Sequence, residues 1–331
     1  MKPKSRCLSV RPASIVALAT LLLVLPQQLK AQKEGWVDVT PSARLFYHIE
    51  GSGTDTIVVL HGGPAFGYGY MAPDLAGLGR GHVLVYYDQR GAGRSTLDTV
   101  TAHLTIQQYV EDLEQLRRAF KLQTVTLLGH SWGGMLAAQY AIAHPTMTRR
   151  LILVDPMTPA QALMDLPAEA PLPALDSATG QRVASLFERL ADGPDPVATC
   201  REVYSPSMMY RLFFADSTSG SRFRGDFCAR PAEALRASAI VISRTIAGLG
   251  STFDVRPALP TVSAQVLVLR GRRGAIAREA MVAWTRGFKN ARMVEVAGAG
   301  HYIWVDRPDM FLNTVEAFLA GHWPKEAIFP E

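Results

Sequence analysis

Cysteine is scarce in this sequence, and the cysteines and histidines do not form a metal-binding pattern. Only three of the 331 residues are cysteines, and the eight histidines are scattered along the chain. There is no C-x-x-C pair and no closely spaced pair of histidines, which the common zinc sites need. The sequence therefore predicts no metal site.

Nucleotide-binding loops are also missing. The chain has no G-x-x-x-x-G-K run, and the short Gly91-Ala92-Gly93 segment lacks the third glycine of a dinucleotide-binding loop. With no metal pattern and no phosphate-binding loop, we expect a protein that works without a cofactor.

The chain has no net charge outside its N-terminal segment. The whole chain carries a net charge of +5. Five of its 34 basic residues and none of its 29 acidic residues lie within residues 1–31, so the remainder has 29 of each. A balanced net charge gives no support for a polyanionic partner. We expect neither a nucleic acid nor a stable membrane partner for the mature chain.

The sequence has no apolar run long enough to span a bilayer comfortably. Its longest N-terminal run, 13–25, covers 13 residues, whereas a membrane-spanning helix needs about 20. Basic residues precede this run, and Ala31 ends an acceptable cleavage site. Residues 1–31 therefore indicate a signal peptide and an exported, periplasmic or extracellular protein. An uncleaved membrane anchor is the alternative.

Export also bears on the two cysteines that would remain after cleavage. Cys7 would leave with the signal peptide, while Cys200 and Cys228 would stay in an oxidising compartment. A disulfide between them is possible, and two buried free thiols are the alternative.

Apolar, strand-like runs alternate with helical patterns along most of the chain. Strands are predicted at 44–50, 55–63, 82–91, 124–131, 149–156, 264–271 and 291–298. Helices are predicted at 107–120, 133–144 and 306–322. This order predicts an α/β fold with a mostly parallel central sheet and helices on both faces.

The alternation stops between Pro156 and about Pro260. Prolines cluster at the start of this stretch, and helical patterns follow at 180–191 and 233–250. We predict a core formed by residues 32–156 and 257–331, with a helical cap inserted at 157–256.

The segment Gly129-His130-Ser131-Trp132-Gly133 lies between a predicted strand and a predicted helix. A G-x-S-x-G sequence in this context is typical of a sharp turn that presents the serine at the end of the sheet, where the following helix directs its positive end. We therefore predict that Ser131 is a nucleophile.

Two further strand ends supply what such a serine needs. His61-Gly62-Gly63-Pro64 follows an earlier strand, and the backbone N–H groups of Gly63 and Trp132 would form an oxyanion hole. His301 follows the last predicted strand and is the candidate general base.

Three motifs together resemble a known family. The chain looks like an α/β hydrolase, and "HGGP" (61–64), "DQRGAGRS" (88–95) and "GHSWGG" (129–134) resemble the proline iminopeptidase branch of serine hydrolases. The likeness spans residues 36–322. It implies an α/β-hydrolase fold with an inserted helical cap and a Ser-His-acid mechanism. It also implies structural rather than catalytic roles for Asp88, Arg90 and Ser95.

The acid of the triad is where the sequence departs from this family. Relatives usually place an Asp in a G-x-x-D pattern after the strand at 264–271, but here Gly274 occupies that position. Asp155, at the end of the strand that follows the nucleophile helix, is the preferred substitute, since some relatives carry the acid there. Glu279 and the absence of any acid are the alternatives.

The substrate stays open at this level. Iminopeptidases of this kind bind the substrate amine with glutamates of the cap, and Glu202 is the nearest candidate by position. The resemblance favours a prolyl aminopeptidase acting on small peptides. The alternatives are a carboxylesterase or lactonase of the same fold, and a non-catalytic binding protein on a hydrolase scaffold.

Overall fold

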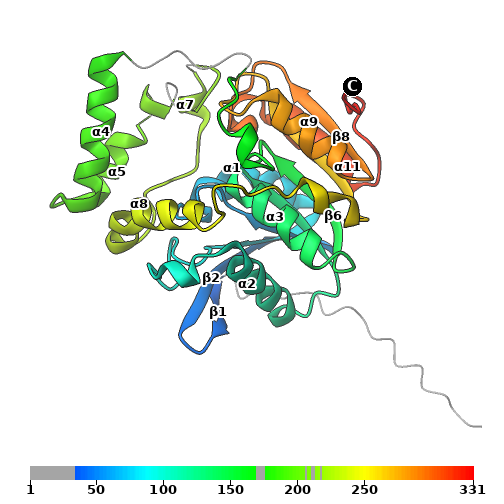
Figure 1. Ribbon diagram of the computed structural model, residues 1–331, viewed down its shortest axis with the longest axis horizontal. Coiled ribbons are helices and arrows are strands. Elements are labelled where there is room, and N and C mark those ends of the chain that lie inside the picture. Colours follow the sequence, from blue (N-terminus) through cyan, green and yellow to red (C-terminus); the bar gives the residue numbers. More distant parts are fainter. Residues whose placement is uncertain (1–33, 169–175, 206, 210–212, 217) are drawn as a thin grey trace, which may run out of the picture. The chain divides into compact units, whose positions relative to one another are not determined.

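The computed structural model describes residues 34–168, 176–205, 207–209, 213–216 and 218–331 (Figure 1). The predicted signal peptide, residues 1–31, lies outside this part of the chain. No helix among the described residues is both long and apolar enough to cross a membrane.

One mixed sheet organises the described residues. Its strands run in the order β1-β2-β4-β3-β5-β6-β7-β8. The pairs β1–β2 and β2–β4 are antiparallel, and every other neighbouring pair is parallel. The bounds are β1 Glu34–Thr40, β2 Ala43–Gly51, β3 Asp55–Leu60, β4 His82–Tyr87, β5 Val125–His130, β6 Thr148–Val154, β7 Gln265–Gly271 and β8 Ala291–Val296.

The parallel strands are continuous apolar runs because both faces of the sheet are covered. All six residues of β5 are buried, as are the last four of β3. The register brings the carboxyl ends together: Leu60 pairs with Gly129, and Val154 pairs with both His130 and Leu269. The residues that follow β3, β5, β6 and β7 therefore meet at one edge of the sheet.

The helices of the core pack on this sheet. In Figure 1, α3 lies beside β6, and it also contacts β5 and α2; α9 contacts β7 and β8. The bounds are α1 Ala72–Leu75, α2 Ile106–Ala119, α3 Trp132–Ala143, α9 Arg278–Gly287, α10 Ile303–Asp306 and α11 Pro308–Leu319. Short 3₁₀ turns are η1 Tyr68–Tyr70, η2 Ala76–Arg80, η3 Thr101–His103, η4 Gln161–Leu163 and η5 Arg256–Thr261.

Helices also occupy the stretch between β6 and β7. The bounds are α4 Ser177–Asp192, α5 Pro196–Val203, α7 Ser219–Arg222 and α8 Ala232–Ala247. Helices α4, α5 and α8 pack on one another. The described residues all belong to one compact unit. The helical stretch between β6 and β7 is called the cap below.

Candidate active site

Ser131 sits at a strained turn between β5 and α3. Its φ of 54° lies in the left-handed region that non-glycine residues rarely adopt. A Cβ on Gly129 would overlap the carbonyl of Gly133, and a Cβ on Gly133 would overlap the carbonyl of Leu60. Only glycine fits at both flanking positions, as a sharp strand-to-helix turn requires.

The predicted oxyanion loop lies against this turn. A Cβ on Gly62 would come within 3.0 Å of the Ser131 Cβ. Gly63 has a φ of 45°, and its carbonyl accepts from the Phe66 N–H at 2.8 Å, which closes a turn. The backbone N–H groups of Gly63 and Trp132 donate to no described residue. Both donors are thus free to bind a developing oxyanion.

Gln89 connects the two halves of this oxyanion site. Its Nε2 donates to the carbonyl of His61 at 2.8 Å, and its Oε1 accepts from the Trp132 indole N–H at 2.9 Å. The backbone N–H of Gln89 donates to His61 Nε2 at 3.0 Å, so His61 carries its proton on Nδ1, which donates to the Gly62 carbonyl. Burial lowers the pKa of His61 to about 4 and keeps the ring neutral.

His301 and Asp155 are brought together. His301 Nδ1 donates to Asp155 Oδ2 at 2.6 Å, and the Asp155 side chain is fully buried. This bond fixes the tautomer of His301 and leaves Nε2 to accept a proton. Ser131 makes no side-chain hydrogen bond within the described part of the chain, as in many ligand-free enzymes, where catalytic hydrogen bonds tighten only once substrate binds.

Gly274 provides the space for the Asp155 carboxylate. A Cβ on Gly274 would lie 3.0 Å from Asp155 Oδ2 and 3.5 Å from Oδ1. Asp155 Oδ1 is buried and has no hydrogen-bond partner among the described residues, an arrangement that is costly and that a catalytic role can explain. Glu279, the other candidate acid, is exposed on the first turn of α9.

His130, the residue before the nucleophile, joins the oxyanion loop to the catalytic histidine. Gly62 N–H donates to the Tyr70 hydroxyl at 2.6 Å, and that hydroxyl donates to His130 Nδ1 at 2.7 Å. His130 Nε2–H in turn donates to the His301 carbonyl at 3.1 Å. Burial holds the pKa of His130 well below its usual range, with His301 adding to the shift. The neutral ring therefore acts as a bridge.

Asp306 connects the cap to the loop that carries His301. Its buried carboxylate accepts from the backbone N–H of Gly300 at 2.7 Å and of Ala215 at 3.1 Å, and from the Ser219 hydroxyl. The N–H of His301 itself donates to the Phe213 carbonyl at 3.1 Å. The position of the histidine loop thus depends on Phe213, Ala215 and Ser219 of the cap.

Glu202, the predicted amine-binding residue, is engaged elsewhere. Its carboxylate accepts from Arg182 at 2.9 Å and from Arg189 at 3.4 Å, and these bonds join α5 to α4. The Arg182 hydrogen bond lowers the pKa of Glu202. No hydrogen bond or ion pair connects Glu202 to Ser131 or His301 within the described residues.

The remaining sequence features have structural partners. Cys200 and Cys228 form a disulfide. Arg90 pairs with Asp112 at 2.6 Å, and Ser95 Oγ donates to the Asp88 carbonyl. Within the described ranges, no cluster of His, Cys, Asp and Glu could hold a metal ion.

Comparison with known proteins gives a family-level match. Residues 55–308 match the family described as the alpha/beta hydrolase fold. A proline iminopeptidase of Heyndrickxia coagulans is 36% identical over 124 residues, which cover 37% of this chain and 43% of that protein. The chain thus matches less than half the length of this relative.

Longer matches are more distant. A cis-3-alkyl-4-alkyloxetan-2-one decarboxylase of Xanthomonas campestris is 25% identical over 303 residues, covering 86% of this chain and 94% of that protein. The crystal structure of a Mycobacterium smegmatis proline iminopeptidase, 19% identical, superimposes with a TM-score of 0.58 and covers 87% of this chain and 98% of that one. The last likeness concerns the fold alone.

Proposed function

Because this chain belongs to the α/β-hydrolase fold family, and because His301 Nδ1 lies 2.6 Å from Asp155 Oδ2, we propose that it is a serine hydrolase with Ser131 as nucleophile, His301 as general base and Asp155 as the acid. The His301–Asp155 contact carries this proposal. It supplies the carboxylate that Gly274 cannot provide, and it therefore argues against a non-catalytic scaffold.

The proposed reaction has two steps. Ser131 Oγ attacks the substrate carbonyl while His301 Nε2 takes its proton, and the imidazolium is stabilised by Asp155. The oxyanion is bound by the N–H groups of Gly63 and Trp132. His301 then returns the proton to the leaving group. Water, activated by the same histidine, hydrolyses the acyl-enzyme.

We propose that the preferred substrate is an ester rather than a peptide with a free N-terminal amine. Recognition of a free α-amine needs a carboxylate near the acyl site, but the cap candidate Glu202 is held by two arginines. The distant relative named for an oxetan-2-one, which is a cyclic ester, supports the same substrate class. Prolyl aminopeptidase activity is the second candidate, because the 36% identity to a proline iminopeptidase favours it.

We also propose that the protein is exported to the periplasm or the extracellular space. The Cys200–Cys228 disulfide supports this location, since such bonds persist in oxidising compartments. Protein sequencing of the mature N-terminus tests the cleavage step: a start at residue 32 supports cleavage after Ala31, and a start at Met1 contradicts it and favours the uncleaved anchor.

Labelling with a fluorophosphonate probe tests the nucleophile. We expect the wild type to react and the Ser131→Ala variant to stay unlabelled. A folded wild-type protein that does not react would contradict the proposal. Parallel assays with p-nitrophenyl acetate and prolyl-2-naphthylamide then separate the two substrate classes. Faster turnover of the naphthylamide would favour the aminopeptidase.

A further inference from the structure

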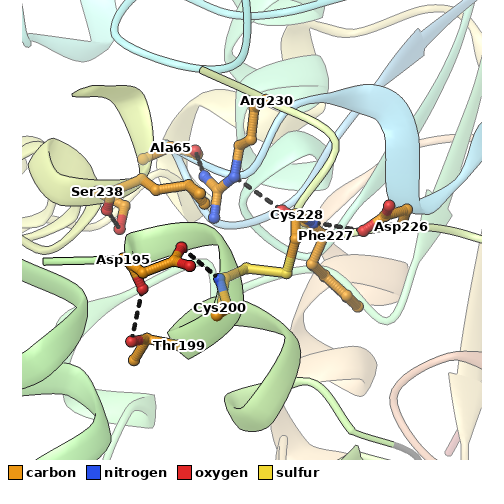
Figure 2. The surroundings of a disulfide bond; sticks show 11 residues. Ala65, Asp195, Thr199, Cys200, Asp226, Phe227, Cys228, Arg230 and Ser238 are labelled. Carbon is orange, nitrogen blue, oxygen red and sulfur yellow. Dashed lines mark hydrogen bonds between the residues drawn. A yellow bond between two sulfur atoms is a disulfide. The ribbon is translucent and has the colours of Figure 1, made fainter. Parts of the chain in front are cut away.

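Arg230 is a buried cation of the cap that forms no ion pair with any described residue. Its side chain is only 9% exposed. Its Nε donates to the Phe227 carbonyl at 2.8 Å, and its Nη1 donates to the Ala65 carbonyl (Figure 2). Nη2 donates to no described residue. Two N–H groups of this guanidinium are therefore available to a ligand.

The two carboxylates whose charge reaches Arg230 do not neutralise it at close range. These are Asp88 and Asp226. Asp88 accepts from the backbone N–H groups of Tyr68 and Arg94, and Asp226 accepts from the Cys228 N–H. Neither forms an ion pair with Arg230. Burial lowers the pKa of Arg230, and an unpaired buried charge is costly unless something compensates it.

Arg230 lies beside the oxyanion loop. The Ala65 carbonyl that it binds belongs to the Gly63–Phe66 turn, and the preceding residue, Gly62, packs against Ser131. The guanidinium also lies 5.8 Å from the centre of the Phe66 ring. Arg230 thus lies at one end of the oxyanion loop, and Ser131 lies at the other end.

The disulfide helps to hold this cation in place. Cys228 is two residues before Arg230, and its bond to Cys200 ties the segment to α5 (Figure 2). The neighbouring rings of Tyr204 and Phe227 stack at 4.4 Å and continue to Phe66. The segment around Arg230 is therefore fixed both covalently and by packing.

We infer that Arg230 binds an anionic group of the substrate, so that this hydrolase acts on esters whose acyl part carries a second, ionised carboxylate. This inference rests on the serine hydrolase function proposed above. A guanidinium suits a carboxylate because it is planar, always charged and rich in donors. The same charge repels the free ammonium group of an aminopeptidase substrate.

Two p-nitrophenyl esters of equal chain length test this inference. The hemiglutarate carries a terminal carboxylate where the valerate carries a methyl group. Each hydrolysis consumes one water and releases p-nitrophenol, and the uncatalysed rate is subtracted. We expect the wild type to favour the hemiglutarate by tenfold or more in kcat/KM, roughly the effect of one charge-assisted hydrogen bond. We expect Arg230→Gln to reduce this ratio towards one.

A matched control excludes a purely structural effect. Arg236, on α8 of the cap, also donates to backbone carbonyls, those of Gly193 and Ala191. Arg236→Gln should leave the substrate ratio unchanged, and Arg230→Lys should keep part of it. A wild type without preference for the hemiglutarate, or an equal loss of both activities in Arg230→Gln, would overturn the inference.

The inference can fail separately from the proposed function. Fluorophosphonate labelling reports on Ser131 whatever the substrate charge. If no ester is hydrolysed, calorimetry with glutarate and valerate on the Ser131→Ala protein still decides the role of Arg230. Tighter binding of glutarate that is lost in the Ser131→Ala/Arg230→Gln double variant supports it, and equal binding of both acids contradicts it.

Discussion

The carboxylate of Asp155 occupies the space into which a side chain at position 274 would project: a Cβ on Gly274 would lie 3.0 Å from Asp155 Oδ2. Position 274 follows β7, and Asp155 follows the neighbouring strand β6. A carboxylate that follows either strand would thus lie in the same space beside His301. That space has room for one such side chain and not for two. The glycine that looks like a defect in the sequence is what allows Asp155 to be there.

The first prediction concerns Asp155 itself. Asp155→Asn should lower kcat by about 10³–10⁴-fold, because an amide can hold His301 in the wrong tautomer and does not stabilise its charged form. Steady-state kinetics checks this, with circular dichroism as a control for folding. Near-native kcat in a folded variant would eliminate Asp155 as the acid.

The second prediction moves the acid between the two strands. Gly274→Asp alone should lower both activity and stability, since two carboxylates would crowd one buried space. The double variant Asp155→Gly/Gly274→Asp should recover at least about tenfold in kcat over Asp155→Gly. The control is Asp155→Gly/Gly274→Ala, in which no carboxylate returns. Equal rates in the two double variants would show that position 274 cannot serve His301.

The third prediction concerns Gln89. Gln89→Leu removes both hydrogen bonds between the oxyanion loop and Trp132 and leaves two buried polar groups unpaired, at a cost of about 1–3 kcal/mol each. Misplaced oxyanion donors should lower kcat by about 10²-fold with a smaller change in KM. Kinetics and chemical denaturation measure both effects. An unchanged kcat in a folded Gln89→Leu protein would contradict the role given to Gln89.

The fourth prediction is a pH dependence of stability that arises from His61. Its pKa is lowered from 6.5 to about 4 in the folded protein, so the unfolded chain binds more protons between these values. The contribution of neutral His61 is complete above pH 6.5 and is lost as the pH falls to about 4. The loss is on the order of 3 kcal/mol.

Comparison with a His61→Gln variant isolates this contribution. Asp88 acts in the opposite direction over the same range, because burial raises its pKa to about 6, but it is common to both proteins. Urea denaturation from pH 4 to pH 7 should show the wild type losing more stability than the variant. Parallel curves would contradict the role given to His61.

The sequence was sufficient to predict the fold and to nominate the main site residues. The alternating strands and helices predicted the mostly parallel sheet correctly, because buried parallel strands are long apolar runs. Several elements were missed, among them β1 and α9. β1 has only two buried positions, Gly35 and Val37, and so forms no apolar run. α9 follows Ala277, whose side chain cannot cap a helix, so its start carries no local signal.

The supporting residues could not be found from local patterns. Gln89 and Trp132 are 43 positions apart, and Tyr70 and His130 are 60 apart. These partners meet only once the sheet has aligned its strand ends. The motif at 88–95 marks the loop that holds Gln89, but it does not show which residues Gln89 contacts. The role proposed for Arg230 could not be predicted from the sequence either, because it depends on a hydrogen bond to the Ala65 carbonyl, 165 positions away.

The backbone angles of Ser131 and Asp155 carry a last consequence. Among the described residues other than glycine, only Lys121, Ser131 and Asp155 have a positive φ, a conformation that costs about 1 kcal/mol or more for each such residue. Two of the three are proposed triad members. Glycine at either position would relieve the strain and remove the chemistry. Selection for thermal stability alone would therefore favour replacement of Ser131 and Asp155 by glycine. Only selection for catalytic activity would keep both residues.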